Sequence, residues 1–227
     1  MEETTANLVG PAPIHLVLTP SQREALQAIL NLQRNPKAFS PWYADATITF
    51  DHYPFNFAPI TPGTDLALGH PYALGFGVEF TSLPTGKPVY AVSAANFSGQ
   101  TGNVVSLNDI PNSAPRTTYS TFAQSDGSIV ATFSAPVNWV TIDVWPYNTA
   151  TGYTGGLNIP YVQALDANMT VIATTSIATP APNTWQTLPP ITRQQADISV
   201  VVFTLFGSEL EPVGAVFDNL HFKRPTP

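Results

Sequence analysis

The chain contains no cysteine, and few of its residues carry a charge. Without cysteine, no disulfide, thiolate zinc site or cysteine nucleophile can form. Charged residues make up 10% of the chain, against roughly 25% in an ordinary soluble domain. The surface must therefore consist largely of Thr, Ser, Asn, Gln and backbone groups, as is common in secreted β proteins.

Positive charge is especially scarce. There are 8 Lys and Arg residues against 15 Asp and Glu residues, which gives a net charge of −7 and a pI of about 4.8. A nucleic-acid interface needs a basic patch, and anionic membranes attract basic segments. The sequence shows no such patch, so we expect neither nucleic acid nor an anionic membrane surface as a partner.

Long apolar runs are also missing. No stretch approaches the roughly 18 apolar residues that a membrane span requires, so none is expected. The first residues, MEETTANLVG, lack a basic segment followed by an apolar run, so we expect no signal peptide in this chain. The chain is then either cytoplasmic or the mature form of an exported protein with an added Met.

Apolar residues are nevertheless abundant, at 44% of the chain, which is enough for a sizeable core. The 23 prolines and 14 glycines separate short runs rich in β-branched and aromatic residues, a pattern typical of strands. The predicted strands are Thr47–Asp51, Gly77–Ser82, Val89–Ala94, Val104–Ser106, Thr117–Phe122, Ser128–Ser134, Trp139–Val144, Tyr161–Asp166, Thr170–Ser176, Thr184–Leu188, Ile198–Phe206 and Val213–Phe222. Many strands without alternating helices indicate an all-β sandwich or barrel.

The last two predicted strands differ in character. Ile198–Phe206 is apolar on both parities, which predicts a strand covered on both faces. In Val213–Phe222, period-2 alternation places Val216 and Leu220 on one apolar face, and Asp218 falls on the same face. A carboxylate in such a position is expected to have a partner or a cation.

One segment is predicted to be a helix. Thr19 occupies an N-cap position, Pro20 the first helical position and Gln22 the capping-box position, and Asn35-Pro36 ends the segment. Two placements are open for this helix. It packs on the edge or end of a sandwich, or it belongs to an arm that docks on a neighbouring subunit.

The sequence thus divides into an N-terminal arm and helix, residues 1–45, and a β-sandwich, residues 46–227. The arm contains an apolar, proline-rich segment that could lie along a neighbour. Residues 1–46 are therefore the expected route to a homo-oligomer.

Several short motifs occur in a characteristic order: Ile48-Thr49-Phe50-Asp51, then Tyr72 to Phe80, then Tyr161 to Asp166, and finally Phe217-Asp218-Asn219-Leu220-His221-Phe222. This order resembles the jelly-roll domains of extracellular bacterial proteins related to carbohydrate-binding modules and galactose-binding-like domains. The resemblance implies a jelly-roll β-sandwich, here with an N-terminal extended arm and one short helix. It also implies an extracellular or surface-associated domain that binds a polysaccharide or another glycan.

The resemblance further implies a calcium ion where the first and last strands meet. Carried to this sequence, it assigns Asp51 and Asp218 as ligands, with Asn219 nearby. Ca²⁺ takes roughly six to eight oxygen ligands and accepts backbone carbonyls. The alternative is that both aspartates cap strand ends or accept backbone hydrogen bonds.

Sugar binding requires exposed aromatic faces beside a few polar groups. Trp145 and Tyr147 share a parity at the end of a predicted strand, and Tyr153 and Asn158 follow in a glycine-rich segment. These four residues form the predicted ligand site. The alternative for Trp145 and Tyr147 is packing in the core or at its rim.

Other aromatic residues receive different predictions. Tyr53, Phe55 and Phe57, in a long proline-rich loop, form a second candidate for sugar binding. Trp139 and Trp185 fall within strand-like patterns and are predicted to be core residues.

No motif predicts catalysis. The G-x-S-x-G, H-E-x-x-H, Walker and dinucleotide patterns do not occur. Carboxylate pairs can always be drawn among 15 Asp and Glu residues, so they indicate nothing by themselves. We therefore expect a non-catalytic binding domain. A second hypothesis is a structural subunit of a virion, fibre or surface layer that assembles through its N-terminal arm.

Overall fold

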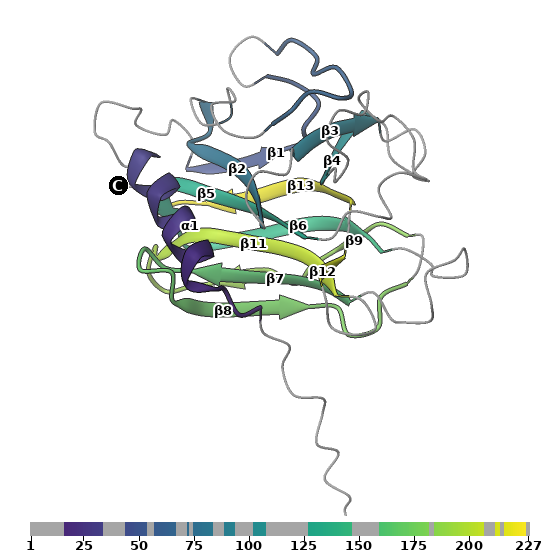
Figure 1. Ribbon diagram of the computed structural model, residues 1–227. Helices are drawn as coiled ribbons and strands as arrows, with labels where there is room; N and C mark the ends of the chain where they lie inside the picture. Colours follow the sequence, from purple (N-terminus) through teal and green to yellow (C-terminus); the bar gives the residue numbers. More distant parts are fainter. Residues whose placement is uncertain are drawn as a thin grey trace, which may run out of the picture.

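The computed structural model describes most of the chain in separate segments. These are residues 16–33, 44–53, 57–66, 72, 75–83, 89–93, 102–107, 127–146, 159–181, 184–206, 212–213 and 216–225. Within them, one helix and two antiparallel sheets are present (Figure 1). No helix among these segments is long and apolar enough to cross a membrane.

Sheet 1 has seven strands and the order β10-β6-β13-β4-β3, with β1 paired to β13 and β9 paired to β6. Its strands are β1 (Asp45–Ile48), β3 (Val89–Ser93), β4 (Asn103–Leu107), β6 (Trp139–Trp145), β9 (Gln186–Thr187), β10 (Ile191–Thr192) and β13 (Val216–Lys223).

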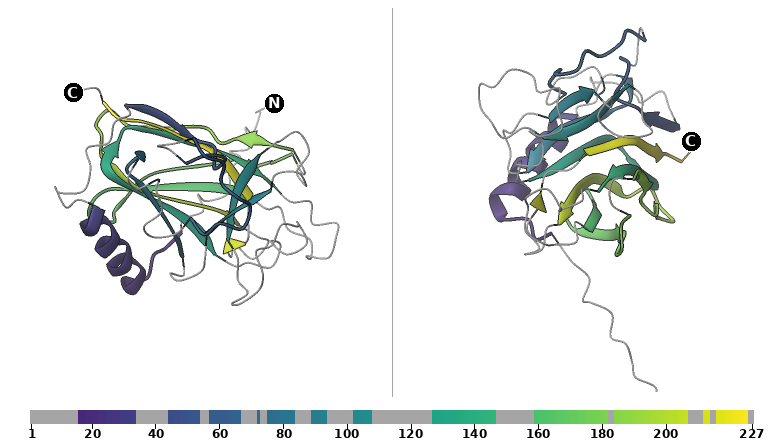
Figure 2. Two further views of the ribbon diagram at one scale, coloured as in Figure 1. Left: turned by 90° about the horizontal axis from the view of Figure 1, so that it is seen from above. Right: turned by 90° about the vertical axis from the view of Figure 1, so that its right-hand side faces the viewer.

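Sheet 2 has six strands and the order β2-β5-β11-β7-β8, with β12 paired to β11. Its strands are β2 (Val78–Leu83), β5 (Ser128–Val137), β7 (Ile159–Leu165), β8 (Val171–Ser176), β11 (Ile198–Phe206) and β12 (Pro212–Val213). The chain crosses repeatedly between the sheets, for example from β5 to β6 to β7. The sheets stack as two layers (Figure 2), so the predicted all-β jelly-roll sandwich is confirmed.

The space between the sheets is filled by one large apolar cluster. Phe203 of β11 meets Phe217 of β13 edge to face with ring centroids 4.9 Å apart, and Phe133 of β5 meets Phe222 of β13 at 5.2 Å. These four rings are almost fully buried. Edge-to-face pairs of this kind add to the hydrophobic stabilisation of the interface between the sheets.

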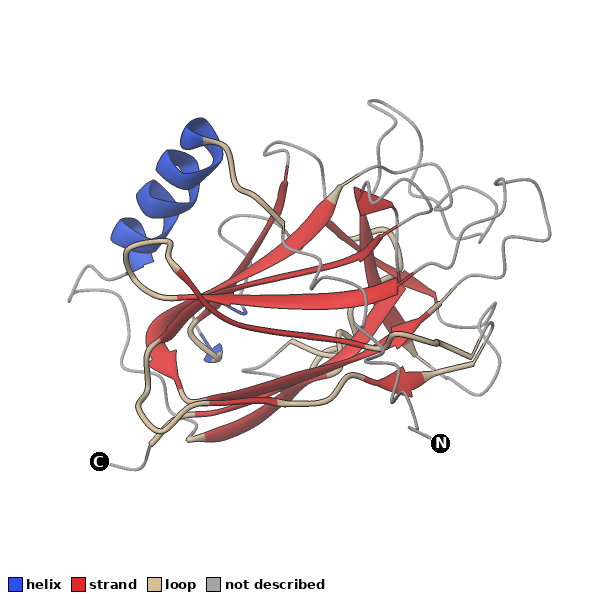
Figure 3. Cartoon of the chain, turned by 90° about the horizontal axis from the view of Figure 1, so that it is seen from below, coloured by secondary structure: helices blue, strands red, loops and turns tan. Residues whose placement is uncertain are grey.

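The other face of β11 is covered by α1 (Pro20–Gln33). Leu26 and Leu30 are completely buried and belong to the same apolar cluster as Val200 and Val202. Figure 3 shows the helix outside the sandwich, beside one layer. The prediction that this strand is covered on both faces is confirmed. The helix lies on the face of sheet 2, rather than on the edge or end of the sandwich.

The start of the helix is fixed by the capping box that the sequence predicts. The backbone N–H of Thr19 donates to Gln22 Oε1 at 2.8 Å, and the backbone N–H of Gln22 donates to Thr19 Oγ1 at 3.3 Å. Arg23 then donates to the carbonyl of Met169 at 2.6 Å. Buried Gln163 of β7 exchanges two hydrogen bonds with the backbone of Leu16. The helix and the residues before it are therefore anchored to sheet 2 of their own chain.

The predicted alternation in the last strand is wrong beyond Asp218. A register shift lies between Asp218 and His221, and Asn219 takes a φ of 49°. Because this bulge inserts one residue, Phe217 and Leu220 both point into the core, whereas Val216 packs in a separate cluster on the outer face of sheet 1. The predicted single strand Val213–Phe222 is also divided into β12 and β13.

Other expectations remain untested. Residues 1–15, 34–43 and 108–126 lie outside the described residues, and with them most of the arm and the strand predicted at Thr117–Phe122. The division at residue 45 and the homo-oligomer formed through residues 1–46 therefore stay predictions.

We expect Leu30→Ala to lower the free energy of unfolding by about 2–4 kcal/mol, because it opens a cavity between α1 and β11. Chemical denaturation measures this directly. Leu32→Ala is the matched control: Leu32 lies on the same helix but is 73% exposed, so its loss should cost less than about 0.5 kcal/mol. Equal losses would contradict the docking of the helix on sheet 2.

Candidate functional site

The chain leaves β1 through an unusual backbone conformation at Phe50. Its φ of 60° lies in the left-handed region, which non-glycine residues seldom adopt. The ring is completely buried and packs against Phe80 and Tyr72, with centroid distances of 5.4 and 6.1 Å. The buried ring offsets the backbone strain and fixes the point at which the chain turns away from the sheet.

The loop that follows is closed by its own backbone hydrogen bonds. Tyr53 N–H donates to the carbonyl of Ala58 at 2.9 Å, Phe57 N–H donates to that of Tyr53 at 3.2 Å, and Ile60 N–H donates to that of Asp51 at 2.7 Å. These bonds fix the backbone that carries Tyr53 and Phe57. The ring of Phe57 is 76% exposed, which is unusual for so large an apolar group.

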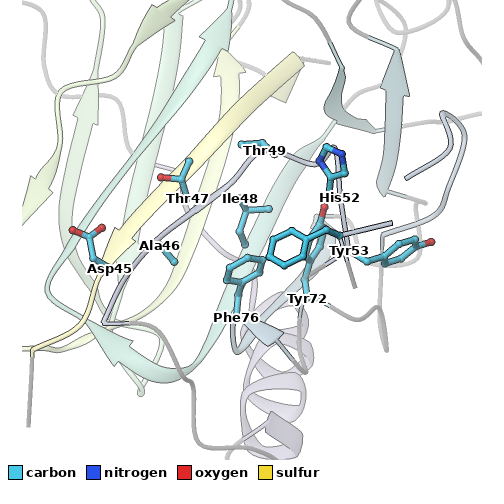
Figure 4. Close-up of a pocket in the computed structure, with 10 residues that line it drawn as sticks. Asp45, Ala46, Thr47, Ile48, Thr49, His52, Tyr53, Tyr72 and Phe76 are labelled. Carbon is cyan, nitrogen blue, oxygen red and sulfur yellow. The ribbon is translucent and has the colours of Figure 1, made fainter. Parts of the chain in front are cut away.

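A pocket of about 390 Å³ opens between this loop and β1 (Figure 4). It is lined by Asp45, Ala46, Thr47, Ile48, Thr49, His52, Tyr53, Phe57, Tyr72 and Phe76. One wall is β1 itself, which pairs only with β13 among the described strands. Figure 4 shows Tyr53, Tyr72 and Phe76 on one side of Ile48, and His52 beyond Thr49. The pocket thus combines aromatic rings with hydroxyl, imidazole and carboxylate groups.

Asp45 at the pocket wall is held by two side chains of β13. His221 Nε2 lies 2.5 Å from Asp45 Oδ1, and Lys223 Nζ lies 3.2 Å from Asp45 Oδ2. The hydrogen bonds from His221 and then Lys223 lower the pKa of Asp45 below its ordinary value. The carboxylate is therefore ionised at neutral pH and oriented before any ligand arrives.

Arg224 connects the two walls of the pocket. Its backbone N–H donates to the carbonyl of Ala44 at 2.6 Å, and its Nη2 donates to the carbonyl of Phe76 at 2.7 Å. The guanidinium lies 4.7 Å from the ring centroid of Phe222. Burial lowers the pKa of Arg224 to about 10, which leaves it charged at neutral pH. Arg224 thus bonds the residue before β1 through its backbone and the backbone of Phe76 through its guanidinium.

A second polar region surrounds Asp218, which is only 4% exposed. Burial raises the pKa of Asp218 to about 8. The backbone N–H of Asn219 donates to Asp218 Oδ1 at 2.7 Å and opposes this rise in the pKa. The negative charges of Asp51 and Asp143 raise the pKa further. Asn219 Nδ2 donates to Asp143 Oδ2 at 2.8 Å. The fold therefore concentrates three carboxyl groups in one small region.

Asp51 reaches this region from the loop after β1. Its Oδ1 accepts a hydrogen bond from the backbone N–H of Asn103 at 2.5 Å, and Asn103 Nδ2 donates to the carbonyls of Phe50 and Ile60. Gly102 has a φ of 90°, and a Cβ there would overlap the Asp51 carboxylate. Glycine is thus required both by the backbone conformation and by the close approach of Asp51.

The structure brings together the three residues predicted to hold calcium. Asp51 and Asp218 lie close enough for their charges to interact, and Asn219 follows Asp218. Within the described segments, however, no group of three or more His, Asp or Glu side chains is arranged to hold a metal ion. A calcium ion here would therefore also need amide, carbonyl or water oxygens, which calcium accepts.

The predicted sugar site has a different environment. Trp145 is 5% exposed and meets Trp185 edge to face at 5.6 Å, in a cluster that includes Val104 and Val216. This placement favours the packing alternative for Trp145. Tyr147, Tyr153 and Asn158 lie outside the described residues, so their ligand role stays a prediction.

Trp139 is not in the core between the sheets, where the sequence pattern had suggested it. The core side of β6 is occupied by Val140, Ile142 and Val144, so Trp139 falls on the outer face and is half-buried. Its ring lies 4.7 Å from that of His221. The alternation of these three apolar residues already indicates the outward orientation of Trp139.

Comparisons with known proteins give only distant structural likenesses. No protein-family model matches the chain, and no curated protein matches it. One similar structure contains the CBM22-1–GH10 modules of Clostridium thermocellum xylanase 10B, solved with xylohexaose. The sequence identity is 12% and the TM-score is 0.42. The match covers 80% of this chain and 28% of the xylanase chain. The chain thus spans less than a third of that xylanase structure.

Two further similar structures are single domains. The K2 cleaved adhesin domain of Lys-gingipain has 14% identity and a TM-score of 0.42, with 79% of this chain and 99% of that one covered. The CBM22-1 xylan-binding domain of Paenibacillus barcinonensis Xyn10C has 12% identity and a TM-score of 0.35, with 65% and 87% covered. Carbohydrate-binding β-sandwiches are thus among the structures it resembles, but likeness at these scores does not transfer function.

Asp218 should make stability fall as pH rises. Its folded-state pKa is about 8, above the ordinary 3.8, so the folded protein binds more protons than the unfolded protein between these values. In the presence of chelator, the contribution of Asp218 to the free energy of unfolding should therefore be complete below about pH 4. It should decline as the pH rises to about 8 and then stay constant. In thermal melts, Asp218→Asn should reduce the fall of the melting temperature with pH. Asp143→Asn should reduce this fall by a smaller amount. An unchanged slope in Asp218→Asn would contradict the assignment.

Proposed function

We propose that this chain is a non-catalytic glycan-binding domain and that the pocket beside β1 is its binding site. The observation that carries the proposal is the set of aromatic rings in this pocket: exposed Phe57 beside half-buried Tyr53 and Phe76. Such rings can pack against the apolar faces of sugar rings, and the surrounding polar groups can bind sugar hydroxyls.

The polar groups suit a neutral, hydroxyl-rich ligand. Thr47 and Thr49 supply hydroxyls, and His52 supplies an imidazole. Asp45 offers carboxylate oxygens that are already oriented by β13. The net charge of −7 disfavours polyanions at long range. An extracellular or surface location, where polysaccharides are encountered, is part of the same proposal.

Phe57→Ala should weaken glycan binding by about tenfold or more, which corresponds to about 1.4 kcal/mol of lost contact energy. The measurement is isothermal titration of the full chain with xylan, mannan, β-glucan and dextran. Because Phe57 is 76% exposed, the variant should keep its melting temperature.

The matched control is Leu32→Ala, which removes another exposed apolar side chain, from α1. It should bind as the unchanged chain does. Absence of binding to every glycan in the panel, or unchanged affinity in Phe57→Ala, would refute the pocket as a glycan site.

We further propose that a structural calcium ion binds between Asp51 and Asp218, with Asn219 beside it. The support is the electrostatic cost of the arrangement without a cation. Asp218 is only 4% exposed, and its carboxyl group lies near those of Asp51 and Asp143. A divalent cation would offset this repulsion. It would also fix the loop after β1, which carries Tyr53 and Phe57 of the pocket.

Calcium should therefore raise the melting temperature of the unchanged chain at pH 7 relative to chelator, because it binds the folded state alone. Asp218→Asn should abolish this rise, and Gly102→Ala should reduce it by displacing the Asp51 carboxylate. Asp166→Asn, on a distant turn, is the control and should keep the full rise. Equal melting temperatures of the unchanged chain with calcium and with chelator would exclude the ion.

A further inference from the structure

A row of side chains crosses the outer face of sheet 1 and ends at the pocket. The strand register pairs its members in sequence across four strands: Thr192 of β10, Trp139 of β6, Lys223 of β13 and Asp45 of β1. Their chain neighbours Ile191, Val140, Phe222 and Ala46 are buried in the core. Since successive side chains of a strand point to opposite faces, the four members of the row point outward.

A second, shorter row lies beside the first. Thr141 of β6 pairs with His221 of β13, and His221 pairs with Thr47 of β1. The two rows are joined at His221, which bonds Asp45 and lies against the ring of Trp139. We call these side chains together the outer strip of sheet 1.

The outer strip is continuous with the pocket. Asp45 and Thr47 belong to the strip and also line the pocket wall. Lys223 Nζ, which binds Asp45, lies 5.1 Å from the ring centroid of Trp139. A ligand that leaves the pocket over β1 therefore meets the charged pair first and the indole ring next.

The distance matches an extended ligand. β1 and β6 are separated by β13 alone, so their axes lie about 10 Å apart, or two strand spacings. A short oligosaccharide covers such a length. The strip holds one carboxylate beside one ammonium and one imidazole, so its charge is nearly balanced and suits hydroxyl groups better than a polyanion.

We propose that a neutral linear polysaccharide extends from the pocket across the outer strip and packs a further sugar ring against Trp139. The domain then binds an internal stretch of a chain rather than a single terminal sugar. This inference rests on the proposed glycan-binding function. It adds Trp139, Lys223 and His221 as binding residues outside the pocket.

The test is the dependence of affinity on ligand length. Cello-, xylo- and manno-oligosaccharides from disaccharide to hexasaccharide are titrated into the full chain. The unchanged chain should bind the hexasaccharide of its preferred series about tenfold or more tightly than the disaccharide. Trp139→Ala should keep disaccharide affinity within about twofold and lose the gain with length, whereas Phe57→Ala should weaken binding at every length.

Two variants keep the test independent of folding. Trp139→Phe retains a ring against His221 and should keep part of the increase of affinity with ligand length. Thr192→Ala, at the far end of the row, should change this increase least. Each variant is first checked for a cooperative melt. Should Trp139→Ala fail to fold, loss of part of the gain in Trp139→Phe supports the proposal, and an unchanged gain refutes it.

The outcomes separate this inference from the proposed function. If no oligosaccharide of any length binds, the glycan-binding function itself is wrong. If disaccharides bind but longer chains bind no tighter, or if Trp139→Ala keeps the whole gain, only the role of the outer strip is wrong. Tighter binding of oligogalacturonate than of every neutral series would overturn the neutral class of ligand.

Discussion

The structure depends on the need to cover both faces of β11. Val201, Phe203 and Leu205 point into the space between the sheets, whereas Val200 and Val202 point the other way. Neither face can remain in water without losing the burial that holds the sandwich together. Sheet 1 covers one face and α1 covers the other. Because the helix occupies the outer face of sheet 2, the aromatic and charged groups described above gather instead on sheet 1, along its outer face and beside β1.

Two departures from regular strand geometry lie in sheet 1 near Asp218. Phe50 and Asn219 both adopt positive φ, and they flank the region where β1 and β13 meet. The bulge at Asn219 places Asp218 on the outer side together with Val216, while Leu220 and Phe222 still reach the core. A regular strand could not satisfy both requirements. Local rules are thus broken beside a buried carboxylate and beside the loop that we propose to bind a ligand.

The sequence predicts the fold better than the site, for a physical reason. The bounds of β11, Ile198–Phe206, and the capping box of α1 follow from local patterns and were predictable. The short strand β10 has only two residues, too few to show a period. The bulge in β13 leaves only a weak local signal: Asn219 accepts a positive φ more readily than most residues, but an Asn alone does not mark a bulge. The pocket was even less accessible, because it joins β1, the loop after it, Phe76 and the contacts of Arg224, which are distant in sequence. Of the pocket, the sequence indicates only the aromatic residues Tyr53 and Phe57 of the loop.

Several groups of the pocket are held by contacts behind them. Tyr72 packs on Phe50 and Phe80 in the core, Arg224 holds the carbonyl of Phe76, and β13 holds Asp45. A weakly binding ligand such as a sugar gains little from each contact, so the entropy lost in ordering the site would cancel much of that gain. A site ordered before binding avoids this loss. The same argument applies to the proposed strip: Trp139 contacts both His221 and Lys223, so it would offer a further ordered contact at little entropic cost. Affinity for a long chain would then grow by repeating modest contacts along a rigid sheet, without any deep cavity.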